Sequence, residues 1–485
     1  MAADRLASAC LGRPADRPNI NPAQPAMNLT PVLRAIGLTL LLSACSERTR
    51  LPPQADMGPR PTLVAPTKTL LPTVNIAPAS PWPAGQTPVA AAGLRVAALA
   101  SGLDHPRWLH VLPNGDVLVA ESNAPPRPDD AQGIKGWIMK RVMRRAGAGV
   151  PSANRITLLR DADGDGVAEV RTAFLQNLNS PFGMALVGNR FYVANTDAVL
   201  EFPYVTGETS IQAAGRKLTD LPGGPLNHHW TKSLIASPDG SKLYATVGSN
   251  SNVAENGIAA EEGSAAIWEI DRASGIQRLF ATGLRNPNGM AWMEAEAAMA
   301  GAPAAGAAPV APTLWTVVNE RDEIGSDLVP DYLTSVRDAG FYGWPYSWYG
   351  ANVDSRVVPQ RPDLVAQARV PDYALGAHVA ALGLVSGSGS TLPLRLNAGA
   401  AGPAQGVFIG LHGSWNRRPH SGYKVVYVPF ANGMPQPGLP VDVLTGFLSA
   451  DGKAWGRPVG VAIDRQGALL VADDVGNVIW RVSAP

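Results

Sequence analysis

The fold is decided by short stretches such as QGALLVAD, residues 466–473. Gln466-Gly467 is typical of a tight turn, and the apolar run Leu469–Asp473 behind it is typical of a buried β-strand. The same order of turn, apolar strand, turn and alternating strand recurs from Gly102 onward. The apolar runs predicted as inner strands are Val117–Glu121, Phe191–Asn195, Leu243–Val247, Leu314–Asn319, Val407–Leu411 and Leu469–Asp473.

Alternating strands follow some of these runs and are predicted to end a unit. They are Ile267–Ile270, Lys424–Val428 and Val478–Val482. Six units over roughly 390 residues predict an all-β fold, a six-bladed β-propeller of four-stranded antiparallel blades with long loop insertions. A β-sandwich also uses short strands, but it would not repeat this order six times. In a propeller, loops from one end of every blade converge on the central channel, so residues distant in sequence can share one pocket.

Composition agrees with a strand-rich domain and excludes one class of partner. Among 485 residues, 46% are hydrophobic, and 50 Gly and 44 Pro supply many turns. Lys and Arg number 40 against 39 Asp and Glu. This balance provides no basic field for nucleic acid, so no nucleic-acid partner is expected.

The N-terminal region carries a targeting pattern. Met27–Arg34 is a short basic region, and Ala35–Leu42 is an apolar run too short to span a membrane comfortably. The following Leu42-Ser43-Ala44-Cys45 resembles the bacterial lipobox, which implies that Cys45 is lipidated and becomes the mature N-terminus. Ser46, where no Asp stands, resembles the signal for the outer rather than the inner membrane. A buried structural cysteine is the alternative interpretation of Cys45.

These patterns divide the chain into three parts. Residues 1–45 are predicted to be an upstream extension and a lipoprotein signal peptide, with Met27 as the natural start. Residues 46–92 are rich in Pro, Ala and Thr and are predicted to form an extended tether. Residues 93–485 are predicted to form the propeller. The expected location is the periplasmic side of a bacterial membrane, held there by the lipid anchor alone.

Several predicted loops carry polar side chains that a turn does not require. In TGLRNPNGMAW, residues 282–292, the turn signals Asn-Pro and Asn-Gly surround Arg285 and Asn286. A surface turn is the alternative interpretation of an isolated stretch of this kind. Loops of the same class are Asn227–Trp230, Asn319–Asp322, His412–Arg417 and Trp455–Pro458.

At these loops the chain resembles the soluble glucose/sorbosone dehydrogenases, six-bladed propellers that use pyrroloquinoline quinone (PQQ) with calcium. The resemblance extends over about residues 94–482 and is closest to the L-sorbosone dehydrogenase branch. The motifs that carry it, in chain order, are ANRITLLRDADGDG, HHWTKSLIASPDGSKLYATVGSNSN, GLRNPNGMAW, NERDEIGSDLVPDYL, FYGWPYSWYG, HGSWNRRPHSGYK and GRPVGVAIDRQGALLVADD. The resemblance implies oxidation of a sugar or sugar-derived alcohol or aldehyde, with electrons passing to an external acceptor.

The resemblance also implies roles for single residues. The family's catalytic base is a histidine nine residues before a Pro-Asp turn, which here is His229, with His228 as its structural neighbour. A neutral imidazole can take the hydroxyl proton of the substrate. Arg285 matches the arginine that stabilises developing negative charge, and Asn286 a cofactor ligand. Arg457 matches an arginine that binds the carboxylates of PQQ; an exposed turn arginine is the alternative.

Two departures from the family pattern are visible. Where family members that oxidise glucose bind the cofactor with a lysine, this chain has Ser414–Arg417. Within that run Trp415, Asn416 and Arg417 are the candidate cofactor contacts, and Arg418 is an alternative to Arg417. Where those members bind calcium through carbonyls of a Gly-Pro pair, this chain has Glu320-Arg321. Their backbone carbonyls remain available for calcium, and Asp322 could add charge.

A separate acidic loop contains Asp161, Asp163 and Asp165 at the spacing with which an EF-hand loop begins. The twelfth position is Thr172 rather than Glu, and no flanking helices are evident. A solvated turn and a structural calcium site are both compatible with this loop.

Two other functions compete with the dehydrogenase. A propeller lactonase or other metal-assisted hydrolase would gather carboxylates and amides around one channel calcium, with Glu121, Asn195, Asn250 and Glu320 as candidates. That reaction would leave His229 and Arg285 without a role. A carbohydrate-binding propeller lipoprotein without enzymatic activity is the other alternative.

Overall fold

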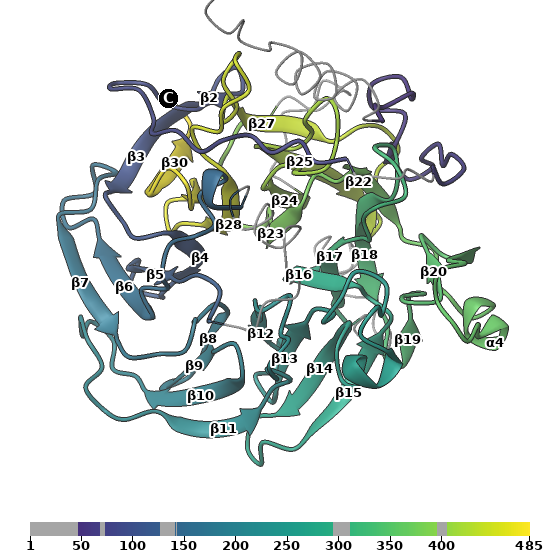
Figure 1. Ribbon diagram of the computed structural model, residues 1–485. Coiled ribbons are helices and arrows are strands. Elements are labelled where there is room, and N and C mark those ends of the chain that lie inside the picture. Colours follow the sequence, from purple (N-terminus) through teal and green to yellow (C-terminus); the bar gives the residue numbers. More distant parts are fainter. Residues whose placement is uncertain (1–46, 68–72, 127–140, 142, 294–310, 395–404) are drawn as a thin grey trace, which may run out of the picture. The chain divides into compact units, whose positions relative to one another are not determined.

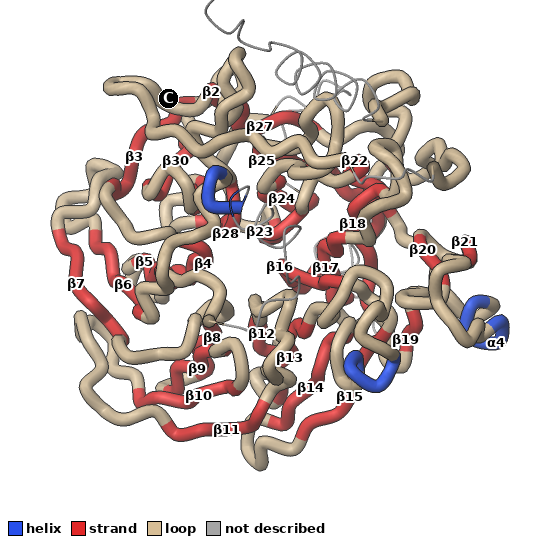
Figure 2. Tube along the Cα trace, viewed as in Figure 1, coloured by secondary structure: helices blue, strands red, loops and turns tan. Residues whose placement is uncertain are grey.

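A computed structural model describes residues 47–67, 73–126, 141, 143–293, 311–394 and 405–485. In Figure 1 the described strands form small antiparallel sheets arranged in a ring. Figure 2 shows that strands and loops dominate the chain. The two helices with described bounds are short, η1 at Ile258–Glu261 and α4 at Pro362–Val365. The predicted six-bladed β-propeller with four-stranded blades is confirmed.

Blades 1 to 5 are sheets whose strands pair in chain order from the first strand to the last. Blade 1 contains β4 (Pro106–Val111), β5 (Val117–Glu121), β6 (Arg155–Arg160) and β7 (Val170–Leu175). Blade 2 contains β8 (Met184–Val187), β9 (Arg190–Ala194), β10 (Ala198–Pro203) and β11 (Arg216–Asp220). Blade 3 contains β12 (Leu234–Ala236), β13 (Lys242–Val247), β14 (Ala266–Asp271) and β15 (Gln277–Thr282).

The other three blades repeat this plan, and blades 4 and 5 contain long insertions between their strands. Blade 4 contains β16 (Asn286–Met293), β17 (Thr313–Asn319), β18 (Pro330–Val336) and β22 (Tyr373–Ala377). Blade 5 contains β23 (Ala381–Ser386), β24 (Gly406–Leu411), β25 (Lys424–Ala431) and β27 (Val441–Thr445). Blade 6 contains β28 (Pro458–Ile463), β29 (Leu469–Asp473), β30 (Val478–Ser483) and β3 (Arg95–Ser101). Because β3 precedes blade 1 in sequence yet pairs with β30 in blade 6, the two ends of the propeller domain close the ring.

Short strands extend some of these sheets at their edges. β1 (Met57–Gly58) pairs with β22, and β2 (Val89–Ala90) pairs with β27. β19 (Gly340–Phe341) runs parallel to β15, and β26 (Met434–Pro435) pairs with β25. β20 (Ser347–Trp348) and β21 (Asn352–Val353) form a separate hairpin.

The first strands of the blades form the inner wall of the propeller. Each of β4, β8, β12, β16, β23 and β28 contacts the first strand of the blade on either side, which closes an inner ring. Glycine makes this close approach possible. A Cβ on Gly183, just before β8, would lie 2.2 Å from the backbone nitrogen of Leu234, and one on Gly289 in β16 would lie 2.5 Å from that of Leu384. Neither distance can be reached by a residue with a side chain.

One sequence prediction about the blades is therefore wrong. The apolar runs predicted as inner strands, Val117–Glu121 among them, are the second strands of their blades. Likewise, the alternating strands predicted to end a unit, such as Val478–Val482, are third strands. The reason is packing: the second strand lies between neighbouring blades and is largely apolar, as the fully buried β5 shows with its Val-Leu-Val-Ala run. Some first strands instead carry glycine and polar residues, as β16 does with Asn286, Asn288 and Gly289.

Residues 46–92, predicted to be a tether, include described segments that contact the propeller closely. Asp56 is buried and accepts a hydrogen bond from the backbone N–H of Ala377 at 2.9 Å. The Trp82 ring packs against Phe447 and Trp480 with centroid separations of 5.7 and 5.3 Å. The prolines keep the segment extended, yet an extended chain can still lie in a groove and bury single side chains. A tether that moves freely would not bury side chains against the propeller in this way.

The predicted signal peptide and Cys45 lie outside the described residues, so lipidation of Cys45 stays a prediction. Within the part of the chain that the structure describes, no helix has the length and apolar character needed to cross a bilayer.

Candidate active site

A cavity of about 710 Å³ lies among loops that precede the first strands and follow the second strands of the blades. These loops meet because neighbouring strands are antiparallel, so the start of the first strand and the end of the second lie at the same end of a blade. The volume is typical of a site for a cofactor or small substrate. Seven residues predicted from sequence line it: His229, Arg285, Asn286, Glu320, Trp415, Asn416 and Arg457.

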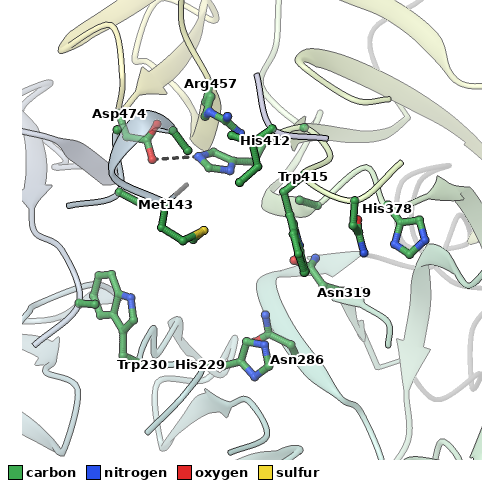
Figure 3. A pocket seen from close by; sticks show the side chains of 18 of the residues that line it. Met143, His229, Trp230, Asn286, Asn319, His378, His412, Trp415, Arg457 and Asp474 are labelled. Atoms are coloured by element: carbon green, nitrogen blue, oxygen red, sulfur yellow. Dashed lines mark hydrogen bonds and ion pairs between the residues drawn. The ribbon is translucent and has the colours of Figure 1, made fainter. Parts of the chain in front are cut away.

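His229 lies on the cavity wall in the loop between β11 and β12 (Figure 3). Its Nδ1 lies 2.7 Å from the carbonyl oxygen of Ser249. A carbonyl can only accept a hydrogen bond, so Nδ1 carries the proton and Nε2 of the neutral ring keeps a free lone pair. Burial, together with the positive charge of Arg285, holds the pKa of His229 well below its usual range. His229 is therefore neutral at physiological pH, with the lone pair of Nε2 available.

Arg285 lies just before β16 and is buried, with 4% of its surface exposed. Its Nη1 donates to the carbonyl oxygen of Glu320 at 2.6 Å, and its Nη2 forms an ion pair with Asp322 at 3.1 Å. Asn252 accepts two further bonds from the same guanidinium, at 3.3 and 3.0 Å. These contacts fix the guanidinium at the cavity wall, and Asp322 balances part of its charge.

The part of the cavity wall away from His229 contains three predicted residues from later loops, Trp415, Asn416 and Arg457. Trp415 presents its ring to the cavity, and Arg457 lies on the side of Asp474 and His412 (Figure 3). The Arg457 guanidinium lies 5.0 Å from the centroid of the Tyr423 ring and donates to the carbonyl oxygen of Ala77 at 3.0 Å. Asn416 donates through Nδ2 to Asp322 at 2.7 Å.

Several buried polar atoms of the wall have no hydrogen-bond partner among the described residues. They are Nε of Arg107, Nε of Arg457, Oδ1 of Asn286, Oδ1 of Asn416 and Oδ1 of Asp474. An unpaired buried polar group is costly, so such atoms are typical of a site that a ligand completes.

Two predicted site residues lie elsewhere. Arg417 does not line the cavity; its Nη2 forms an ion pair with Asp56 at 3.2 Å and lies 3.7 Å from Asp327. The Arg321 side chain is fully buried and forms an ion pair with Asp354 at 2.9 Å. In each case the preceding residue, Asn416 or Glu320, lines the cavity. The arginine side chain that follows it points into the protein.

The carbonyl of Glu320, predicted to bind calcium with that of Arg321, accepts the hydrogen bond from Arg285. A cation on this oxygen would share it with a guanidinium, which disfavours the predicted pair of carbonyls as a calcium site.

Sequence reasoning missed a cluster of titratable groups on the far side of the cavity from His229. Asp474 is buried, accepts a hydrogen bond from His412 Nε2 at 2.9 Å (Figure 3) and forms an ion pair with Arg107. Nε2 of His105 lies 3.7 Å from the same carboxylate. Burial alone would raise the pKa of Asp474, but the two histidines and Arg107 hold it well below its usual range. The signals in the sequence were His-Pro-Arg at residues 105–107, the predicted loop that begins at His412 and the motif that ends in Asp473-Asp474, and none of them alone indicates the cluster.

Two further groups beside the predicted residues were also missed. Lys232 is fully buried, and its ammonium group lies 3.1 Å from Oδ1 of Asn227 and 3.2 Å from the carbonyl oxygen of His229. Asp331 lines the cavity and accepts backbone bonds from Glu320 and Ala380 at 2.9 and 2.7 Å. Burial raises the pKa of Asp331 to about 7.

The acidic loop lies in the turn between β6 and β7, and none of its members is among the residues lining the cavity. Carboxylate oxygens of Asp161, Asp163, Asp165 and Glu169 all lie within 4.8 Å of one another. Glu169, at the ninth position of the loop, was not predicted. Backbone N–H groups already bond these carboxylates, for example Gly164 to Asp161 at 2.7 Å. The solvated turn and the calcium site both stay predictions.

Comparisons of sequence find relatives over parts of the chain. A family described as "TrAA12-like" matches residues 363–484, and a family described as "Domain of unknown function (DUF7133)" matches residues 94–278. An uncharacterized protein of Borreliella burgdorferi is 24% identical over 316 residues, 63% of this chain and 76% of that protein. A pyrroloquinoline quinone-dependent pyranose dehydrogenase of Coprinopsis cinerea is 36% identical over 115 residues, which is 20% of this chain and 16% of that protein.

Solved structures match nearly the whole propeller. A carbohydrate-active enzyme of family AA12 from Trichoderma reesei aligns with a TM-score of 0.62 and 19% identity, over 86% of this chain and 100% of that one. The PQQ domain of the pyranose dehydrogenase from Coprinopsis cinerea, in its holo form, aligns with a TM-score of 0.60 and 21% identity, over 83% and 98% of the two chains. The resemblance predicted from the motifs is thus confirmed: this chain is a six-bladed propeller similar to the PQQ-dependent sugar dehydrogenases.

Proposed function

We propose that this protein is a quinoprotein oxidoreductase that oxidises a sugar or sugar-derived alcohol or aldehyde, of the sorbosone or aldose type, with PQQ as cofactor. The observation that carries the proposal is the joint presence of a neutral histidine, His229, and three arginines on the wall of one cavity. Arg107 and Arg457, each with an unpaired Nε, are suited to carboxylates of PQQ, because guanidinium groups form strong charge-assisted hydrogen bonds to carboxylates. The names of the similar proteins support the same chemistry.

The unpaired atoms of the wall fit such a cofactor. Nε of Arg107 and Nε of Arg457 can donate to carboxylates, and the Trp415 ring offers a flat surface to a planar aromatic group. When bound, PQQ would supply the two-electron acceptor for the sugar. Calcium is part of the proposal through the free amide oxygens of Asn286 and Asn416, which are hard oxygen ligands of the kind calcium prefers.

In the proposed reaction His229 is the general base. Its Nε2 takes the proton of the substrate hydroxyl while Nδ1 stays bonded to Ser249, which keeps the ring in one orientation. Arg285 would supply a fixed positive charge that stabilises the negative charge developing in the reaction, and its four bonds hold it in place without reorganisation. Because the pKa of His229 lies well below its usual range, the base should remain neutral and active into mildly acidic solution.

The hydrolase alternative is weaker in this structure. Of its four candidate ligands only Glu320 is among the residues that line the cavity. Glu121 is instead buried in blade 1 and forms an ion pair with Arg155 at 2.7 Å. A hydrolase would also leave the arginines of the wall without a role.

The test is reconstitution with PQQ and calcium, followed by dye-linked oxidation of a panel of sugars. His229→Ala should lower the oxidation rate by roughly two to four orders of magnitude while PQQ still binds, because a placed base contributes about that much. His228→Ala should keep much more activity than His229→Ala, since the exposed His228 imidazole also lines the cavity but is the neighbour and not the base. Chelation of calcium before PQQ is added should prevent reconstitution. If wild-type protein binds no PQQ, or if both variants are fully active, the proposal is wrong.

A further inference from the structure

Residues 73–82, here called the strap, run along the edge of the cavity. In the sequence, β2 and β3 separate the strap from blade 1. Ile76 lines the cavity directly, and Ala77 beside it is fully buried. The strap is also tied to loops on both sides, because Ala79 donates its backbone N–H to Arg145 at 2.8 Å and Ser80 donates to Ala454 at 2.8 Å. The strap therefore forms part of the cavity wall and is held there by hydrogen bonds to neighbouring loops.

The first functional contact of the strap is with Arg457. The carbonyl oxygen of Ala77 accepts a hydrogen bond from Nη2 of Arg457 at 3.0 Å. A second link passes through Asp473, whose carboxylate accepts from the Arg457 backbone N–H and from Nε1 of Trp82, both at 2.8 Å. The strap thus constrains both the guanidinium and the backbone of Arg457. Nε of this arginine has no hydrogen-bond partner among the described residues.

The second contact is with the loop that carries Trp415. The backbone N–H of Asn75 donates to the carbonyl oxygen of Trp415 at 2.7 Å. The Asn75 side chain donates through Nδ2 to the carbonyl oxygen of Arg417, also at 2.7 Å. Asn75 therefore binds the carbonyl of the residue before Asn416 and that of the residue after it. The side-chain amide oxygen of Asn416 has no hydrogen-bond partner among the described residues.

We propose that the strap is an integral part of the cofactor site, in which Asn75 positions the Trp415–Arg417 loop and the Ala77 carbonyl positions Arg457. This inference rests on the proposed function, since it assumes that these residues contact PQQ. Asn75 is a positioning residue, because it acts through Trp415 and Asn416 and does not itself line the cavity. If docking of the strap favours binding of PQQ, binding of PQQ must favour docking of the strap to the same degree.

The first measurement uses wild-type protein and follows backbone hydrogen exchange with and without PQQ and calcium. Peptides that cover residues 73–82 should exchange several-fold more slowly when PQQ is bound. A peptide that covers β11, at the outer edge of blade 2, should be unchanged. This readout does not depend on turnover or on a variant that might fail to fold.

The second measurement compares PQQ affinity in two variants by quenching of tryptophan fluorescence. Asn75→Ala should raise the dissociation constant of PQQ about fivefold, as expected for the loss of one hydrogen bond. Gln86→Ala is the matched control, because Gln86 belongs to the same N-terminal segment but its side chain is exposed. It should bind PQQ like the wild type. The thermal midpoint of the cofactor-free Asn75→Ala protein should match that of Gln86→Ala within a few degrees.

The outcomes separate the two proposals. If peptides around Arg457 gain protection with PQQ but residues 73–82 do not, the strap proposal is refuted while the proposed function stands. The strap proposal is also refuted if Asn75→Ala binds PQQ as tightly as Gln86→Ala. If the wild type shows neither quenching nor added protection anywhere, PQQ does not bind and the proposed function fails, and the strap proposal fails with it.

Discussion

Lys232 provides a quantitative test of how the His229 loop is held. The side chain is fully buried, and burial lowers the pKa of its amine from 10.5 to about 7. In the unfolded chain the amine keeps its ordinary pKa. Between these two values the folded protein binds fewer protons than the unfolded chain, so stability rises as the pH rises through this window. Below pH 7 the free energy of unfolding should be about 4 to 5 kcal/mol lower than above pH 10.5, because the buried amine is then charged.

The measurable part of this effect lies between pH 7 and pH 9. Over that interval the titration of Lys232 should add about 2 kcal/mol to the free energy of unfolding. Lys232→Met removes the titrating group and should lose this increment, and so should Lys232→Gln, which keeps an N–H donor. The assay is urea denaturation of all three proteins at both pH values. All other titrating groups are shared, so the difference between wild type and variant isolates Lys232.

The functional consequence can be measured on the same proteins. The ammonium group donates to the carbonyl oxygens of His229 and Trp230 at 3.2 and 3.4 Å. Lys232→Met leaves both carbonyls without this donor, so its oxidation rate should fall further than that of Lys232→Gln. The reasoning is refuted if wild type and Lys232→Met gain the same stability from pH 7 to pH 9.

Two further predictions concern the cofactor and the membrane. Arg457→Ala should raise the PQQ concentration needed for activation by roughly ten- to a hundredfold, since hydrogen bonds to charged groups contribute about 1.5–3 kcal/mol each. An unchanged PQQ titration with weaker sugar affinity would instead assign Arg457 to the substrate. Cys45→Ser should leave the protein unprocessed or release it from the membrane fraction, as judged by fractionation and mass. Normal processing and membrane retention of that variant would contradict lipidation.

The number of blades could be predicted from sequence because the second strands are largely apolar and several of them follow a turn signal such as Asn114-Gly115. The radial order of the strands could not be predicted. Sequence shows which strands are buried, but burial between two blades and burial near the channel produce similar apolar runs. What distinguishes the inner strands is the close approach of backbones at Gly183 and Gly289, which depends on the neighbouring blade.

The sequence likewise indicated the loops that line the cavity but not every side chain within them. Adjacent residues such as Asn416 and Arg417 point to opposite sides of the loop, and only the structure shows that Arg417 forms an ion pair with Asp56. The partner lies more than 300 residues away in a segment whose prolines indicated a tether. No local pattern could have predicted that pairing.

The sequence by itself therefore determined the repeated unit, the all-β architecture and the motifs that bring His229, Arg285 and Arg457 to one end of the ring. These features depend on local turn chemistry and on hydrophobic periodicity, which short stretches encode completely. Only the tertiary structure decided which strands face the channel, how Asp474 gathers two histidines and Arg107, and how the strap reaches Arg457 and Trp415. Those features depend on contacts between segments far apart in the chain, and such contacts arise only when the ring closes and brings the segments together.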